Sequence, residues 1–255
     1  MASTQKIPTL LLAVLIPMLP MVWACGGQVS EDQPRATQAA LRTPAPAARP
    51  AAAPAPAPVA KTPLVVFLGD SLTAGLGLDE DQAYPAVLER ELGEEGLPVR
   101  VLNAGVSGDT TAGGLSRIGW ILGQRPDVVV VALGANDGLR ALPVEQAEKN
   151  LREIVRRSQA AGARVLLLGM KMPPNYGPDY TSRFEGMYTA IAKDMNVPLL
   201  PFLLEGVGGD RRLNQADGIH PTAEGQEILA ENVKPYLEDV LREPKPKGAV
   251  GAGAN

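Results

Sequence analysis

The sequence predicts an α/β domain in which a parallel sheet lies between two layers of helices, and two patterns carry this prediction. Continuous apolar runs of strand length, as expected for strands buried on both faces, occur at residues 64–68, 99–102, 128–133, 164–168 and 197–200. Helical patterns separate these runs. Because right-handed crossovers place the connecting helices on both faces of a parallel sheet, the alternation predicts a single domain over residues 63–242.

Three segments repeat apolar residues at the three- and four-residue spacing of one helix face. Pro143 can open the first of them, since proline is favoured at the start of a helix. The apolar positions are Val144, Ala147, Leu151, Ile154 and Val155, then Phe184, Met187, Tyr188, Ile191 and Met195, and finally Leu229, Val233, Tyr236, Leu237 and Val240. Residues 243–255 show no such period, so a disordered tail is expected there.

The first 25 residues are typical of an export signal. Lys6 precedes an apolar stretch, residues 7–21, that is short for a membrane span and interrupted by proline. The segment ends in "VWAC", which resembles a bacterial lipobox, and Cys25 would then become the lipidated first residue of the mature protein. Cleavage after Ala24 with ordinary secretion is the alternative. Since Cys25 is the only cysteine, an intramolecular disulfide is excluded.

Residues 26–62 are dominated by alanine, proline and polar residues, as in "TPAPAARPAAAPAPAPVAKT". Such a composition buries too little apolar surface to fold, and alternating Ala-Pro favours an extended, semi-rigid chain. We therefore expect a disordered tether that holds the domain off a membrane. A segment without any role is compatible with the same composition.

The charge and the rare residues exclude several classes of partner. With 24 Lys+Arg against 28 Asp+Glu and no basic run, the chain lacks the footprint of a nucleic-acid-binding protein. The loop "GDSLTAG" lacks the lysine of a phosphate-binding loop, and one cysteine with one histidine cannot assemble a zinc site. No metal and no cofactor is therefore expected.

Three of the predicted strands run directly into loops of small residues. These loops are "GDSLTAG" at 69–75, "NAGVSGDT" at 103–110 and "GANDG" at 134–138. Because ligands of open α/β sheets bind outside the carboxyl ends of the strands, the loops should crowd one functional edge. They offer the hydroxyl of Ser71, the backbone N–H of Gly108 without a neighbouring Cβ, and the side-chain amide of Asn136.

His220 is the only histidine of the chain and follows Asp217 in "DGIHP". Imidazole can take the proton of a serine hydroxyl near neutral pH, and a carboxylate can stabilise the imidazolium that forms. We therefore predict nucleophilic acyl transfer with Ser71, His220 and Asp217 as the catalytic triad. The backbone N–H groups of Ser71 and Gly108 and the amide of Asn136 would form the oxyanion hole.

Each of these residues also has an ordinary structural explanation. Ser71 can cap a helix, Asn136 suits a strand-to-helix turn, and the "DGIHP" segment can be a capped loop. All of them are nevertheless expected at one edge of the sheet, together with the only histidine. A catalytic site is therefore the preferred interpretation.

Five blocks, "GDSLTAG", "NAGVSGDTTAGGLSR", "LGANDGLR", "MPPNYGPDY" and "DGIHP", resemble in order and spacing those of the SGNH (GDSL) hydrolases. They are most similar to the bacterial acyl-CoA thioesterases, lysophospholipases and arylesterases. The resemblance covers residues 64–241 and places the family's S, G, N and H on Ser71, Gly108, Asn136 and His220. It implies a flavodoxin-like α/β/α sandwich with strand order 2-1-3-4-5. A G-x-S-x-G elbow, the mark of the α/β-hydrolases, is absent from the sequence.

The resemblance also implies a substrate, a carboxylic ester or thioester with an apolar acyl chain. The segment "MKMPPNYGPDY" follows the fourth predicted strand, so Met172, Tyr176 and Tyr180 could line an acyl groove and the segment could act as a lid. An ordinary long loop is the alternative. We expect a monomer that acts on small-molecule or lipid esters.

The place of action follows from the first residues of the chain. They predict an exported protein of the cell envelope, anchored in a membrane as a lipoprotein or, alternatively, periplasmic or secreted. Relatives in the family are commonly periplasmic and soluble. Two further functions stay open, a carbohydrate O-acetylesterase of the envelope and a non-catalytic envelope-binding lipoprotein.

Overall fold

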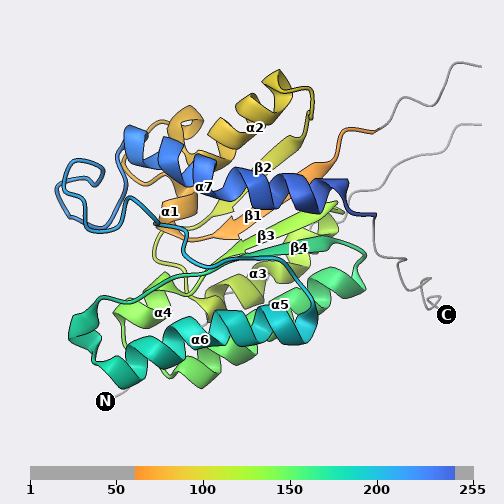
Figure 1. The fold of residues 1–255 in the computed structure, drawn as a ribbon. Helices are drawn as coiled ribbons and strands as arrows, with labels where there is room; N and C mark the ends of the chain where they lie inside the picture. Colours follow the sequence, from red (N-terminus) through yellow and green to blue (C-terminus); the bar gives the residue numbers. More distant parts are fainter. Residues whose placement is uncertain (1–60, 245–255) are drawn as a thin grey trace, which may run out of the picture. The chain divides into compact units, whose positions relative to one another are not determined.

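The computed structural model describes residues 61–244, and these form a sheet between two layers of helices (Figure 1). The expected export signal with Cys25, the tether up to residue 60 and the tail from residue 245 lie outside the described residues. The expected domain, 63–242, falls within the described part.

The sheet has five parallel strands in the order β2-β1-β3-β4-β5, which confirms the predicted topology. The strands are β1 (Leu64–Gly69), β2 (Arg100–Gly105), β3 (Val128–Ala132), β4 (Arg164–Leu168) and β5 (Leu199–Leu200). Every residue of β1, β3 and β4 is buried, because helices cover both faces of these strands. The continuous apolar runs of the sequence reflect this double burial.

Two strands differ from the prediction in length. Strand β2 continues beyond the apolar run to Gly105, because its backbone stays paired with β1 up to the Gly69–Gly105 pair. Strand β5 is limited to two residues. Val197 belongs instead to the turn that closes the preceding helix, where its N–H donates to the carbonyl of Ala192 at 3.0 Å.

The helices form two layers that Figure 1 shows on opposite sides of the sheet, with α2 and α7 on one face and α3, α5 and α6 on the other. Their bounds are α1 (Ser71–Ala74), α2 (Tyr84–Glu94), α3 (Thr111–Gly123), α4 (Ala135–Leu139), α5 (Val144–Ala160), α6 (Pro178–Met195) and α7 (Ala223–Arg242), with 3-10 turns η1 (Glu80–Gln82) and η2 (Pro174–Tyr176). The three predicted helices are confirmed as α5, α6 and α7. Within residues 61–244, no helix is both long and apolar enough to cross a membrane.

Two buried tyrosines support the carboxyl ends of the central strands. The hydroxyls of Tyr84 and Thr73 form a hydrogen bond of 2.9 Å that joins α2 to α1, and the hydroxyl of Tyr188 donates to the carbonyl of Leu133 at 2.9 Å, directly after β3. Both rings are almost fully buried, which stabilises the folded state, and each hydroxyl keeps a hydrogen-bond partner. The strand ends that carry the predicted site thus rest on a well-packed layer.

A buried polar network joins α3, α4 and α5. The carboxylate of Asp137 accepts hydrogen bonds from the backbone N–H of Thr111 at 2.8 Å and from its hydroxyl at 2.7 Å. The same hydroxyl accepts a bond from Asn150 Nδ2 at 3.0 Å, and Asn150 Oδ1 accepts one from Gln146 at 2.9 Å. Asp137, Thr111 and Asn150 are all buried, so each donor depends on its protein acceptor.

We predict that Asp137→Ala lowers the free energy of unfolding by about 2–3 kcal/mol, because it leaves two buried donors of Thr111 without an acceptor. Urea denaturation monitored by circular dichroism measures this change. Asp239→Ala, which removes an exposed carboxylate from α7, is the control and should stay within about 0.5 kcal/mol of the wild type. Equal stability of the two variants would show that the network does not contribute to the fold.

Candidate active site

The predicted site residues lie where β1, β2 and β3 end. Two of the expected loops are in fact short helices, since Ser71 begins α1 and Asn136 lies in α4, while Gly108 falls in the segment between β2 and α3. Helix α1 forms because the carboxylate of Asp70 caps it, accepting the N–H of Leu72 at 3.0 Å. So short a helix carries no apolar period in the sequence, which is why it was not predicted.

Ser71, His220 and Asp217 form a continuous chain of hydrogen bonds. His220 Nε2 lies 2.8 Å from Ser71 Oγ, and His220 Nδ1 lies 2.6 Å from Asp217 Oδ2. With the ring proton on Nδ1, that nitrogen donates to the carboxylate and Nε2 accepts the serine hydroxyl proton. The three residues come from α1 and from the loop before α7, so only the tertiary fold brings them together.

The loop before α7 holds Asp217 and His220 in this orientation. Asp217 Oδ1 accepts the backbone N–H groups of Ile219 and His220, both at 3.0 Å, and the carbonyl of His220 accepts the N–H of Gln215 at 2.7 Å. The hydrogen bond from the His220 ring, aided by these two backbone donors, lowers the pKa of Asp217 to about 2. Asp217 is therefore a carboxylate throughout the neutral range.

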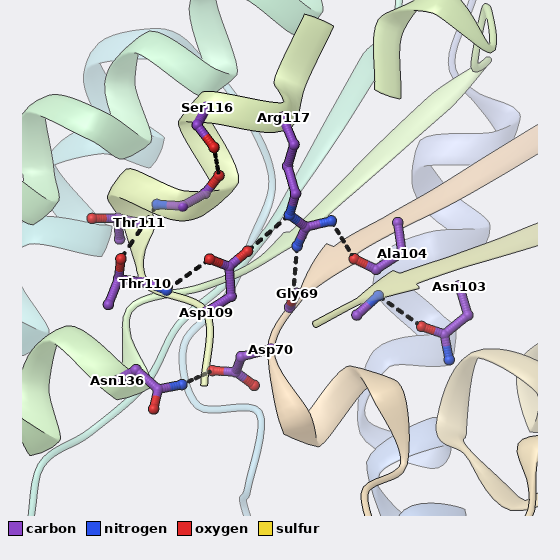
Figure 2. Close-up of polar contacts among 12 residues, drawn as sticks. Gly69, Asp70, Asn103, Ala104, Asp109, Thr110, Thr111, Ser116, Arg117 and Asn136 are labelled. Atoms are coloured by element: carbon purple, nitrogen blue, oxygen red, sulfur yellow. Dashed lines mark hydrogen bonds and ion pairs between the residues drawn. The ribbon is translucent and has the colours of Figure 1, made fainter. Parts of the chain in front are cut away.

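Gly108 and Asn136 border the same space from the other strand ends. Gly108 has a φ of +79°, a conformation that favours glycine, and its carbonyl accepts a hydrogen bond from Arg140 Nη2 at 3.0 Å. The side-chain amide of Asn136 donates to Asp70 Oδ2 at 3.3 Å (Figure 2). An amide nitrogen carries two hydrogens, so this bond leaves a second donor for a ligand.

Ser71, Gly108, Asn136 and His220 all line one cavity of about 570 Å³. Most of the other side chains in its wall are apolar, with Asp70, Ser107, Lys171 and Asn214 as the polar exceptions; the apolar ones are Leu72, Leu76, Ala135, Leu139, Met170, Met172, Pro173, Pro174, Phe202, Leu204 and Ile219. Three of these side chains are unusually exposed for their type, with 43% for Leu76, 40% for Leu139 and 48% for Ile219. The cavity thus has an apolar wall and an apolar rim around a few polar groups, as expected for an acyl-chain ligand.

Of the three residues predicted to line an acyl groove, one is in the wall of this cavity. Met172 lies in the cavity wall, but the wall includes neither Tyr176 nor Tyr180. Their hydroxyls instead donate to the carbonyls of Leu139 and Leu142, both at 2.9 Å, and their rings stack on one another. These bonds attach the segment after β4 to α4 and the turn that follows it, and a contact of the two tyrosines with substrate stays a prediction.

Asp70 is the site residue that the sequence did not single out. Its side chain is only 1% exposed, and burial raises its pKa to about 6, although the bonds from Leu72 and Asn136 act in the opposite direction. Its position directly before Ser71 at a predicted strand end was the available signal. Among residues 61–244, no three His, Cys, Asp or Glu side chains converge as a metal site requires.

Comparison with known proteins extends this description. The model of the GDSL-like lipase/acylhydrolase family matches residues 67–228. Esterase TesA of Pseudomonas aeruginosa is 49% identical over 183 residues, which cover 71% of this chain and 90% of that protein. The Escherichia coli protein named thioesterase 1/protease 1/lysophospholipase L1 is 39% identical over 178 residues, 69% of this chain and 84% of that protein.

The fold is shared with solved structures as well. The crystal structure of TesA superimposes with a TM-score of 0.68 at 47% sequence identity, and the match covers 69% of this chain and 99% of that one. The sequence comparisons and the structure comparison thus match the same region of the chain, which contains the sheet and the candidate site. The chain belongs to the GDSL-like lipase/acylhydrolase family, the SGNH hydrolases that its sequence blocks resemble.

Proposed function

We propose that this protein is a serine ester hydrolase that cleaves carboxylic esters or thioesters with an apolar acyl chain. The observation that carries the proposal is the hydrogen-bond chain from Ser71 through His220 to Asp217 in the wall of an apolar cavity. A serine hydroxyl needs an adjacent base to become a nucleophile, and the imidazole lies within hydrogen-bond distance of it. The catalytic roles of the three residues follow from this geometry.

The reaction proceeds through an acyl-enzyme. Ser71 Oγ attacks the carbonyl carbon of the substrate while its proton passes to His220 Nε2, and Asp217 stabilises the imidazolium. The tetrahedral intermediate collapses, and the leaving alcohol or thiol takes the proton from His220. Water then attacks the acyl group on Ser71 with His220 again as the base, which releases the carboxylic acid and restores the serine.

Three donors would stabilise the negative charge on the tetrahedral oxygen. They are the backbone N–H groups of Ser71 and Gly108 and the side-chain amide of Asn136, all in the wall of the same cavity. Removal of one such donor costs on the order of a hundredfold to a thousandfold in rate. Asp70 would fix the amide of Asn136 through its 3.3 Å hydrogen bond and thereby orient the remaining donor.

The cavity favours a medium-length acyl chain over acetate. Its volume of about 570 Å³ and its apolar wall exceed what an acetyl group would fill. The relatives named esterase and thioesterase 1/protease 1/lysophospholipase L1 support an ester or thioester as the scissile bond. A carbohydrate O-acetylesterase or a non-catalytic binding protein is less consistent with this cavity and with the intact Ser71–His220–Asp217 chain.

The place of action is part of the proposal. Residues 1–25 would direct export, Cys25 would carry a lipid anchor, and residues 26–62 would tether a monomeric domain to the membrane. Release of an unanchored periplasmic or secreted enzyme is the alternative. Either route brings the cavity into contact with esters of the cell envelope or its surroundings.

Hydrolysis of p-nitrophenyl acetate, butyrate, octanoate and palmitate tests the proposal. We expect the highest kcat/KM at medium chain length, and we expect Ser71→Ala or His220→Ala to lower it at least about a thousandfold with the fold retained in circular dichroism. Ser182→Ala, a change on the exposed surface of α6, is the matched control. Activity confined to acetate would indicate an O-acetylesterase, and no Ser71-dependent rate on any ester would contradict the proposal.

The buried Asp70 predicts how stability changes with pH. Because burial raises its pKa from 3.8 to about 6, the folded state binds a proton that the unfolded state lacks between these values. The contribution of Asp70 to stability should therefore fall as the pH rises through this window and change no further above it. A pKa shift of this size corresponds to a loss of about 3 kcal/mol in the free energy of unfolding at neutral pH.

Asp70→Asn removes the titration and keeps a side chain that caps helices. The difference in unfolding free energy between variant and wild type should change by about 2–3 kcal/mol in favour of the variant between pH 3.5 and pH 7.5. Urea denaturation at both pH values measures it. A difference that stays constant with pH would show that Asp70 titrates at an ordinary pKa.

A further inference from the structure

Arg117 of α3 donates hydrogen bonds to three separate segments behind the candidate site. Nε donates to Asp109 Oδ2 at 2.8 Å, Nη1 to the carbonyl of Ala104 at 2.6 Å and Nη2 to the carbonyl of Gly69 at 2.9 Å (Figure 2). Its side chain is 20% exposed and that of Asp109 is 10% exposed, so solvent screens the contacts little. The proposed catalytic mechanism does not use this residue.

Two of the three acceptors lie in the strands that lead into the site. Gly69 is the last residue of β1 and stands two residues before Ser71, while Ala104 lies in β2 four residues before Gly108. The carbonyl of Gly69 also accepts the N–H of Val106 at 3.0 Å, which is the bond that continues the pairing of the two strands. Arg117 therefore binds at the point where β1 and β2 separate toward the cavity.

The third acceptor is the side chain of Asp109, the residue that follows Gly108. Asp109 Oδ1 accepts the N–H of Thr110 at 3.1 Å while Oδ2 bonds to Arg117. The packing here is close, since a Cβ on Gly113 would lie 1.7 Å from Asp109 Oδ1. Glycine at position 113 thus leaves the space that the Asp109 carboxylate occupies.

Arginine is the side chain that suits this arrangement. Its planar guanidinium directs several N–H groups at fixed angles, so one residue can bond to two carbonyls and a carboxylate at once. A lysine ammonium is a single point of charge and cannot reach all three acceptors with the same geometry. Arg117 is not part of the cavity wall, so it does not touch a substrate there.

We propose that Arg117 is a positioning residue that fixes the separation between Ser71 and the N–H of Gly108. The inference rests on the proposed function, in which the nucleophile and this oxyanion donor must act on one carbonyl group. A displacement of about 1 Å in such a pair can cost on the order of a hundredfold in rate. Because Arg117 makes no contact with the substrate, its loss should lower kcat and leave KM nearly unchanged.

Kinetics of Arg117→Met and Arg117→Lys with p-nitrophenyl octanoate test the proposal. We expect Arg117→Met to lower kcat between about tenfold and a hundredfold with KM within twofold of the wild type. Arg117→Lys should restore only part of this loss, and it replaces Arg117→Met in the test if that variant does not fold. Arg156→Met, which removes an exposed arginine from α5, should leave kcat unchanged.

Hydrogen–deuterium exchange of residues 103–110 gives a readout that does not depend on catalysis. We expect this segment to exchange several-fold faster in Arg117→Met, whereas α5 and α6 keep the wild-type rate. Unchanged exchange, or full wild-type kcat in Arg117→Lys, would overturn the positioning role. A wild-type protein without Ser71-dependent hydrolysis would instead refute the proposed function and leave the exchange result to decide the inference.

Discussion

The parallel register of the central strands is the constraint on which the rest of the site depends. Gly69 of β1 pairs with Gly105 of β2 on one side and with Ala132 of β3 on the other, so three strands end at the same level. A few residues after each of these strand ends, the chain carries a group that the reaction would need: Ser71, Gly108 and Asn136. Any shift of register by one residue would move these groups apart and turn buried side chains to the opposite face.

This arrangement explains which parts of the structure the sequence predicts. Doubly buried strands and long amphipathic helices produce apolar runs and periods, and both are confirmed for β1, β3, β4 and α5 to α7. Helices α1 and α4 are too short to produce a period, and β5 is set by only two pairs with β4. Helix α1 depends on its Asp70 cap and β5 on its pairing with β4, and neither interaction produces an apolar run or period in the sequence.

The same distinction applies to the candidate site. Ser71, Gly108, Asn136, Asp217 and His220 were predictable because their residue types stand out at strand ends and in "DGIHP", and the structure brings them together. Tyr176 and Tyr180, also predicted to line the groove, are outside the cavity wall, and their hydroxyls donate to backbone carbonyls. The contributions of Asp70 and Arg117 depend on burial and on partners distant in the chain, so only the structure reveals them.

The pKa values of two aspartates near Ser71 are shifted in opposite directions. Hydrogen bonds from the His220 ring and the backbone lower the pKa of Asp217 to about 2, whereas burial raises that of Asp70 to about 6. The first stays charged to orient a base, and the second carries a charge that costs stability at neutral pH. Ionisable groups whose surroundings shift their pKa strongly are concentrated at functional sites. Asp70 fits this pattern, since it directly precedes the proposed nucleophile.

Covalent trapping tests whether Ser71 is a nucleophile activated by His220. Intact-mass spectrometry after incubation with a fluorophosphonate, followed by peptide mapping, should show one phosphonyl group per protein on Ser71, with strongly slowed labelling in His220→Ala. The reagent reacts with an activated serine and displaces fluoride, so the adduct reports the nucleophile itself. Labelling of another residue, or equal labelling of the wild type and Ser71→Ala, would contradict the account.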